Sequence, residues 1–135
     1  MVRTARAEQE ALKQHLLRVG ARRCALCGRP FPVNLLVAAH IKKRAACNEE
    51  ERKDFDNVAM LACLLGCDGL YERGYVAVGP GGQLLVAGEV NDAPSVADYA
   101  RDRLRGRSTS WWTSGRERYF RWHRDHTFRN PVGGF

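Results

Sequence analysis

The spacing of apolar positions near the start of the chain predicts an amphipathic helix over residues 5–19. One buried stripe is expected from its apolar side chains, which are Ala5, Leu12, Leu16 and Val19. Gly20 follows as a suitable C-cap residue. The chain is therefore expected to begin with a helix that packs one face against the rest of the molecule.

Two apolar stretches in the middle of the chain predict β-strands, over residues 35–41 and 58–63. The charged segment between them, residues 42–56, is expected to form an exposed loop or a short turn. A short helix is predicted over residues 67–74, ending at Gly74. The middle of the chain thus follows the order strand, strand, helix.

The second half of the chain predicts a hairpin followed by two helices. Strands over residues 75–78 and 83–86 are joined by the turn sequence GPGG. Ser95 is expected to cap a helix over residues 96–105, and a further helix covers about residues 115–126. Core packing, rather than base stacking, is expected of the aromatic side chains Trp111, Trp112, Tyr119, Phe120 and Trp122.

Length and charge limit the class of protein. A chain of 135 residues fits one domain, small enough to profit from an internal cross-link such as a metal. The formal net charge of +7 suits nucleic acid as a partner, although a solvated basic surface would explain it equally well. No apolar run approaches the roughly 20 residues that cross a bilayer, and the polar N-terminus does not read as a secretory signal. We therefore expect a cytoplasmic protein with no membrane partner.

The cysteines form two closely spaced pairs. Cys24 and Cys27 stand as C-x2-C, and Cys63 and Cys67 stand as C-x3-C. Two such pairs suit a closed, tetrahedral thiolate site for structural Zn²⁺, whereas buried free thiols or a reversible disulfide are the competing interpretations. Cys47 stands alone in the charged segment, and we expect it to be an exposed spare thiol.

The order of these motifs resembles that of HNH endonucleases, and most closely the HNH domains of modification-dependent restriction enzymes. The resemblance covers about residues 8–80, and its motifs are the C-x2-C pair, LLVAAHIK, DNVAML and CDGLYERG. It implies an α+β fold with a zinc-stapled ββα-metal core over about residues 20–80. An N-terminal helix, a β-hairpin and a C-terminal helical extension over about residues 93–130 complete a single domain, residues 1–135.

The resemblance also implies roles for individual residues. His40 matches the general base, which would otherwise be an ordinary histidine at a strand end, and Asn57 matches the residue that fixes this histidine or its loop. Asp68 stands where the family has its third motif histidine, so it is expected to bind a catalytic Mg²⁺ or Mn²⁺ ion. Ala39 stands where many relatives place another ligand. Glu72 is either a second ligand or a surface carboxylate.

DNA is the partner that the resemblance implies, held mainly through its phosphate backbone. Phosphate contacts, or alternatively a solvated loop, are expected for Lys42, Lys43 and Arg44, and Arg73 is a further candidate. Non-specific phosphate contacts are also expected from the arginines of the C-terminal third, at positions 101, 103, 105, 107, 116, 118, 121 and 124. His123 and His126 are expected to pack or to face DNA rather than to bind metal. A homodimer or a separate reader domain would complete the system.

Taken together, these features predict a metal-dependent DNA endonuclease of an H-N-D variant, a phosphodiester hydrolase acting in restriction or defence. The alternative is a catalytically inactive zinc module that binds nucleic acid or a protein. Ala39 and Asp68 motivate this alternative, because they replace residues with which related HNH domains bind the catalytic ion and so leave fewer ligands for it.

Overall fold

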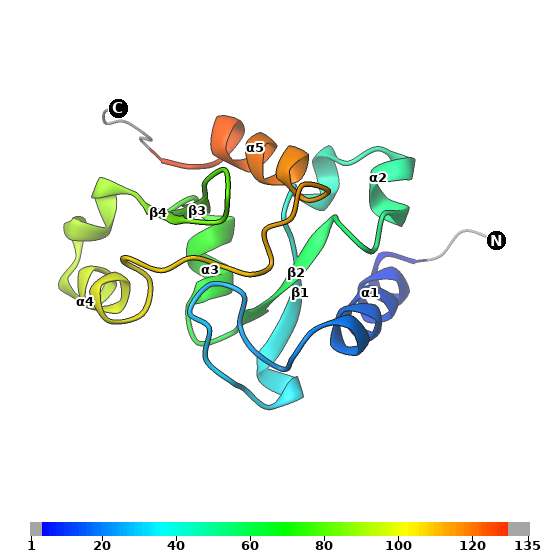
Figure 1. Cartoon of the computed structure of the whole chain (residues 1–135), viewed down its shortest axis with the longest axis horizontal. Helices are drawn as coiled ribbons and strands as arrows, with labels where there is room; N and C mark the ends of the chain where they lie inside the picture. The colour runs from blue at the N-terminus through cyan, green and yellow to red at the C-terminus, as the bar shows by residue number, and fades with distance from the viewer. Residues whose placement is uncertain (1–3, 130–135) are drawn as a thin grey trace.

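The computed structural model describes residues 4–129 and has an α+β architecture (Figure 1). This part of the chain holds five α-helices and two antiparallel strand pairs. The helices are α1 (Ala5–Val19), α2 (Glu49–Lys53), α3 (Cys67–Glu72), α4 (Pro94–Arg103) and α5 (Glu117–His126). The strands are β1 (Leu36–His40), β2 (Ala59–Cys63), β3 (Val76–Val78) and β4 (Leu84–Val86). None of the helices in residues 4–129 is both long and apolar enough to cross a membrane.

The central unit is the antiparallel pair of β1 and β2, which is followed directly by α3. The register places Leu36 opposite Cys63 and His40 opposite Ala59. Every residue of β2 is buried, because helices or loops cover both of its faces. Figure 1 shows α1 on one side of this unit and α4 on the other. The predicted order of strand, strand and helix is confirmed.

Helix α1 packs on both central strands through the middle of its length. Thr4 caps the helix by accepting a hydrogen bond from the backbone N–H of Ala7 at 3.1 Å. Leu12 and Leu16 are fully buried, as predicted. Val19 is 59% exposed and Ala5 is also exposed, so their assignment to the buried stripe was wrong. Only the central turns of the helix face the strands.

The charged segment between the central strands is more ordered than predicted. It contains the short helix α2, which begins at a capping box formed by Asn48 and Glu51. Cys47, just before it, is only 4% exposed, and its thiol donates to the backbone carbonyl of Lys42 at 3.4 Å. The prediction of an exposed thiol was wrong, because this segment is ordered and Cys47 is part of the buried core.

The C-terminal elements also follow the predicted order with one correction. Helix α4 begins at Pro94, and Ala93 is its N-cap, so Ser95 lies inside the helix and does not cap it. Proline suits the first helical position because its missing N–H would have no partner there. In α5, Tyr119 and Phe120 are fully buried, which confirms their predicted packing.

Helix α5 is joined to α3 through a buried histidine. The ring of His123 stacks on that of Tyr71, with centroids 3.7 Å apart, and its Nε2 donates to the Tyr71 backbone carbonyl at 2.7 Å. The Tyr71 hydroxyl in turn donates to the carbonyl of Ile41 at 2.9 Å, just beyond β1. His126 stacks on Trp122 at 4.3 Å. His123 therefore has a packing role, whereas His126 is exposed and stacks on Trp122 at the surface.

We expect His123 to make stability fall in mild acid. Burial lowers the pKa of its imidazole from 6.5 to about 4. The unfolded chain therefore takes up a proton before the folded chain as the pH falls from 6.5 to about 4, and this uptake costs roughly 3 kcal/mol of stability in total. Urea denaturation at several pH values should show a flatter profile for His123→Phe, which keeps the stacking on Tyr71. Equal pH dependence in the two proteins would show that His123 is not responsible.

Candidate functional site

Four cysteines from two distant segments converge at the end of the central strand pair. Their sulfur atoms all lie within 4.8 Å of one another, and all four residues are buried. Cys63 ends β2 and Cys67 begins α3, whereas Cys24 and Cys27 belong to the loop after α1. None of them forms a disulfide. The predicted convergence of the two cysteine pairs is confirmed, and the group can hold a metal ion such as zinc.

The loop from Cys24 to Cys27, called the first knuckle below, is shaped by backbone hydrogen bonds. The N–H of Cys24 donates to the carbonyl of Arg29 at 3.0 Å, and the N–H of Gly28 returns to the carbonyl of Cys24 at 2.9 Å. Gly28 closes this turn with φ of +73°, a conformation that side chains with a Cβ rarely adopt. Ala25 bonds to the carbonyl of Leu61 in β2 at 2.7 Å. These bonds hold both thiols of the knuckle against β2.

The chemistry of the four thiols fits a metal. Tetrahedral zinc with Zn–S bonds of about 2.3 Å separates its sulfurs by about 3.8 Å, which is within the spread found here. The neighbouring Cys24 thiol lowers the pKa of Cys27 to about 6 and also lowers that of Cys63. The same close packing raises the pKa of Cys24 and of Cys67. Four thiols this close cannot all lose their protons unless a cation offsets the negative charge of the resulting thiolates.

Tyr99 of α4 bonds to the cysteine cluster, which sequence reasoning missed. Its hydroxyl lies 3.1 Å from the sulfur of Cys67 and 3.7 Å from that of Cys63. A Cβ at Gly66 would come within 2.7 Å of the Tyr99 ring, so only glycine leaves room for this contact. No local signal marks Tyr99 because it lies 32 residues from Cys67 in the sequence. Its contact shows that α4 belongs to the part of the fold that surrounds the four cysteines.

A cavity of about 610 Å³, called the His40 cavity below, brings together most of the predicted catalytic residues. His40 lines it from the end of β1, and Asp68 and Glu72 line it from α3. The two carboxylates are four residues apart, which places them on one face of the helix. Within the described part of the chain, only the cysteines form a group of three or more ligand side chains close enough to hold one metal ion. His40, Asp68 and Glu72 therefore share the cavity, but their ligand atoms do not converge on one point.

His40 is held in an environment that favours its neutral form. Burial lowers the pKa of the imidazole below its ordinary value of 6.5, and the negative charge of Glu8 only partly opposes this effect. Its Nε2 is buried and has no hydrogen-bond partner among residues 4–129. The ring nitrogen left to reach a water molecule in the cavity is therefore Nδ1.

Asp68 is a carboxylate in an unfavourable setting. Burial raises its pKa most, and the negative charges of Glu72 and Cys63 add to the effect. Removal of a carboxylate from water and the approach of a second acid both destabilise its ionised form. A cation in the His40 cavity would relieve both effects, and carboxylate oxygens are the ligands that Mg²⁺ and Mn²⁺ prefer.

Asn57 lies outside the His40 cavity. Its amide donates to the carboxylate of Asp54 at 3.0 Å, and Asp54 also accepts from the hydroxyl of Tyr119 at 2.8 Å. No hydrogen bond joins Asn57 to His40 within the described residues. Asn57 thus orders the loop that leads into β2, whose first residue, Ala59, pairs with His40.

The basic residues around the His40 cavity divide into paired and unpaired groups. Lys42 is bound to Glu51 at 2.9 Å, and Arg44 is bound to Glu8 at 2.8 Å. Lys43 and Arg73 also line the cavity, and neither forms an ion pair within residues 4–129. These two side chains are therefore the better placed to meet a phosphate, whereas Lys42 and Arg44 hold the surrounding segments together.

The structure thus brings His40, Asp68 and Glu72 to one cavity beside a separate four-cysteine site. Gln9 completes one wall of the cavity, and its amide donates to the backbone carbonyl of Ala38 at 2.6 Å. Comparison with protein-family models and with curated proteins finds no match to this chain. Its function is therefore inferred from these residues and their arrangement.

Proposed function

We propose that this protein is a zinc-stabilised, metal-dependent endonuclease that hydrolyses phosphodiester bonds in DNA. The observation that carries the proposal is the His40 cavity, in which a desolvated imidazole faces the same space as two carboxylates. Unpaired Lys43 and Arg73 border this space. An imidazole, two acids and flanking cations can together supply the base, the metal ligands and the phosphate contacts for hydrolysis of a phosphodiester.

His40 acts as the general base in this proposal. With its pKa held below 6.5, the imidazole is neutral at physiological pH and can accept a proton. Nδ1 takes the proton from a water molecule as the water oxygen attacks phosphorus. The bond from phosphorus to the 3′ oxygen breaks, and that oxygen takes a proton from solvent. General-base catalysis of this kind contributes about 10²- to 10⁴-fold in rate.

Asp68 and Glu72 are the residues that would hold a divalent ion. Their positions one turn apart on α3 present two carboxylates to the cavity, and burial, followed by the negative charge of Glu72, raises the pKa of Asp68. A bound Mg²⁺ or Mn²⁺ supplies positive charge to the phosphate oxygens. Few protein ligands suffice for magnesium, because it keeps several of its waters.

Zinc is the metal that we propose for the four-cysteine site. Four thiolate ligands favour zinc over harder cations, and a closed tetrahedral site leaves no position open for chemistry. Its role is therefore structural. It connects the first knuckle to β2 and α3, and α3 carries Asp68 and Glu72 into the His40 cavity.

DNA is proposed as the substrate because the net charge of +7 attracts a polyanion. A role in restriction or defence follows from the resemblance of the motifs to HNH domains. The competing proposal is a zinc module that binds nucleic acid or protein without cutting. It is favoured by one observation, that His40, Asp68 and Glu72 do not meet as a ready-made metal site.

Removal of one cysteine tests the zinc proposal. We expect about one equivalent of zinc to remain with the purified protein after gel filtration, measured by elemental analysis. Cys63→Ser should leave the chain unfolded or insoluble, since structural zinc sites supply about 10 kcal/mol or more of folding free energy. Cys47→Ser is the matched control, because Cys47 lies outside the cluster. A well-folded wild type without metal would contradict the proposal.

Loss of the base tests the nuclease proposal. His40→Ala should retain zinc and DNA binding but lose at least 100-fold in the rate of plasmid nicking with Mg²⁺ or Mn²⁺. His15→Ala is the control, since His15 does not line the cavity and bonds to Asp56. The wild-type rate should fall in acid with a midpoint below pH 6.5, because that is where His40 takes up its proton. Equal nicking by wild type and His40→Ala would remove His40 from the mechanism.

A further inference from the structure

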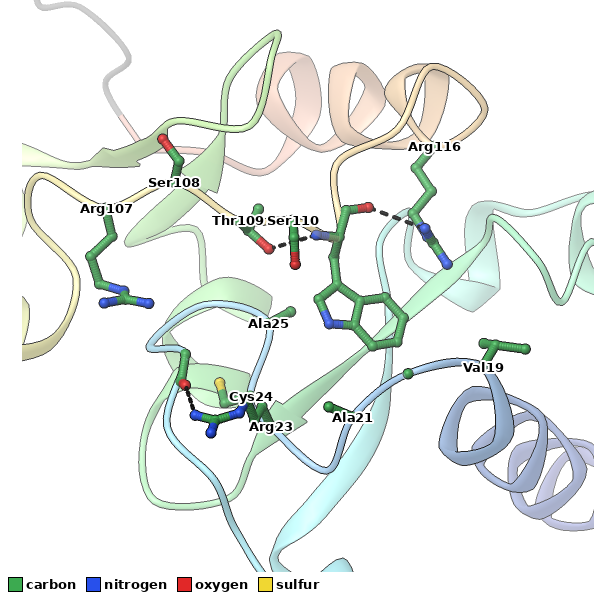
Figure 2. A pocket seen from close by; sticks show the side chains of 13 residues that line it. Val19, Ala21, Arg23, Cys24, Ala25, Arg107, Ser108, Thr109, Ser110 and Arg116 are labelled. Atoms are coloured by element: carbon green, nitrogen blue, oxygen red, sulfur yellow. Dashed lines mark hydrogen bonds between the residues drawn. The ribbon is translucent and has the colours of Figure 1, made fainter.

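A second cavity, called the Arg23 cavity below, lies against the first knuckle (Figure 2). Its volume is about 480 Å³, and it shares no lining residue with the His40 cavity. Its walls come from three parts of the chain: the end of α1, the first knuckle, and the segment between α4 and α5. Arg107 and Arg116, from which phosphate contacts are expected, line this cavity together with Arg23, which has no role so far.

Three arginines line the Arg23 cavity and no acidic residue does. Figure 2 shows Arg23, Arg107 and Arg116 around it; Arg23 comes from the loop after α1, and the other two come from the segment between α4 and α5. None of the three forms an ion pair within residues 4–129. By contrast, the described structure pairs Arg101, Arg118 and Arg124 with carboxylates. Positive charge is therefore concentrated here without an internal counter-ion.

Two of these arginines converge on the same glycine. Arg23 donates from Nη1 to the carbonyl of Gly28 at 3.1 Å, and Arg107 donates from Nε to the carbonyl of Leu26 at 3.3 Å. A Cβ at Gly28 would lie 1.9 Å from Nη2 of Arg107, so a larger residue there would displace the guanidinium from its present position. Backbone carbonyls thus hold two like charges close together. An anion bound beside both groups would interact favourably with each of the two charges.

The third arginine is fixed against Trp111. Arg116 donates from Nη1 to the backbone carbonyl of Trp111 at 3.2 Å, and its guanidinium lies 4.9 Å from the centre of the indole ring. Its Nε is buried and lacks a hydrogen-bond partner within residues 4–129. The negative charges of Asp54 and Asp56 affect the pKa of Arg116 without an ion pair to it. Asp54 is paired with Arg118, and Asp56 is paired with His15. The exposed hydroxyls of Ser108 and Ser110 add further donors to the cavity.

We propose that the Arg23 cavity binds a backbone phosphate of DNA. Planar guanidinium groups match phosphate oxygens, and serine hydroxyls are common phosphate donors. The inference rests on the proposed function for its choice of DNA and deepens it, because it assigns the duplex a second point of contact away from the His40 cavity.

A structural role for these arginines has to be distinguished from a phosphate contact. A zinc ion with four thiolates carries a net charge of about −2, and Cys24 lines the cavity. The arginines could therefore serve only to offset the charge of the zinc site. That role would show in zinc retention, whereas a phosphate contact shows in the salt dependence of DNA binding.

The test measures binding of a labelled DNA duplex to the zinc-loaded protein by fluorescence anisotropy, without Mg²⁺ and at several salt concentrations. Arg23→Gln and Arg107→Gln should each weaken binding roughly tenfold. Each should also lower the slope of log affinity against log salt by about 1, the effect of one lost phosphate contact. Arg22→Gln and Arg18→Gln are matched controls, since both are exposed, do not line the cavity and lose the same charge. The controls should change the slope little.

A second variant keeps the test decisive if an arginine variant fails to fold. Ser110→Glu places a carboxylate at an exposed wall position and should also weaken DNA binding, whereas Ser114→Glu, exposed and outside the cavity, should not. Loss of zinc with unchanged DNA affinity, equal slopes in cavity and control variants, or binding of inorganic phosphate alone would overturn the proposal. Binding is measured without Mg²⁺, so it does not depend on cleavage. If the protein binds DNA through this cavity but never cuts it, only the proposal of nuclease activity is refuted.

Discussion

The convergence of four sulfur atoms is the constraint on which the rest of the structure depends. Two of them come from a loop after α1, and the other two lie where β2 ends and α3 begins. A metal bound at this point would set the distance between strand and helix at their junction. Asp68 follows Cys67 directly, so the same constraint determines where the first carboxylate of the His40 cavity lies. Structural zinc sites supply about 10 kcal/mol or more of folding free energy, which is comparable to the whole stability of a typical small domain.

The C-terminal third of the chain completes both sites rather than forming a separate unit. Tyr99 of α4 bonds to two of the cysteine sulfurs, and His123 of α5 stacks on Tyr71 of α3. Tyr71 in turn bonds to the carbonyl of Ile41, immediately after His40. Helix α3 is therefore held from the cysteine side by α4 and from the other side by α5. This double support keeps the two carboxylates and the imidazole facing one cavity.

Local sequence signals predicted those features that depend on neighbours along the chain. The strands around His40 and Cys63, the helix after Cys67 and the pairing of the cysteines all follow from apolar periodicity and short spacing. Contacts between distant segments could not be predicted in this way. Tyr99 reaches the cysteines from 32 residues away, and Arg107 meets the first knuckle across 81 residues.

The errors have a related physical cause. Cys47 was expected to be exposed because its neighbours are charged, yet the capping box of α2 and the ion pair of Lys42 with Glu51 order that segment around it. Val19 continues the apolar stripe of α1, but the end of the helix extends beyond the strands that it packs on, so Val19 is exposed. In both cases tertiary packing decides the exposure of the side chain, and the pattern of apolar and charged residues along the sequence does not reveal that packing.

The central claim is that two metals have separate roles, with zinc in the four-cysteine site and a catalytic ion in the His40 cavity. Crystals of the zinc-loaded protein soaked in Mn²⁺ would test it directly through anomalous scattering from each metal. The account predicts zinc at the four sulfurs and manganese bound to Asp68, with the manganese peak absent from Asp68→Ala. Manganese at the cysteines, or no manganese in the His40 cavity at concentrations that support nicking, would contradict it.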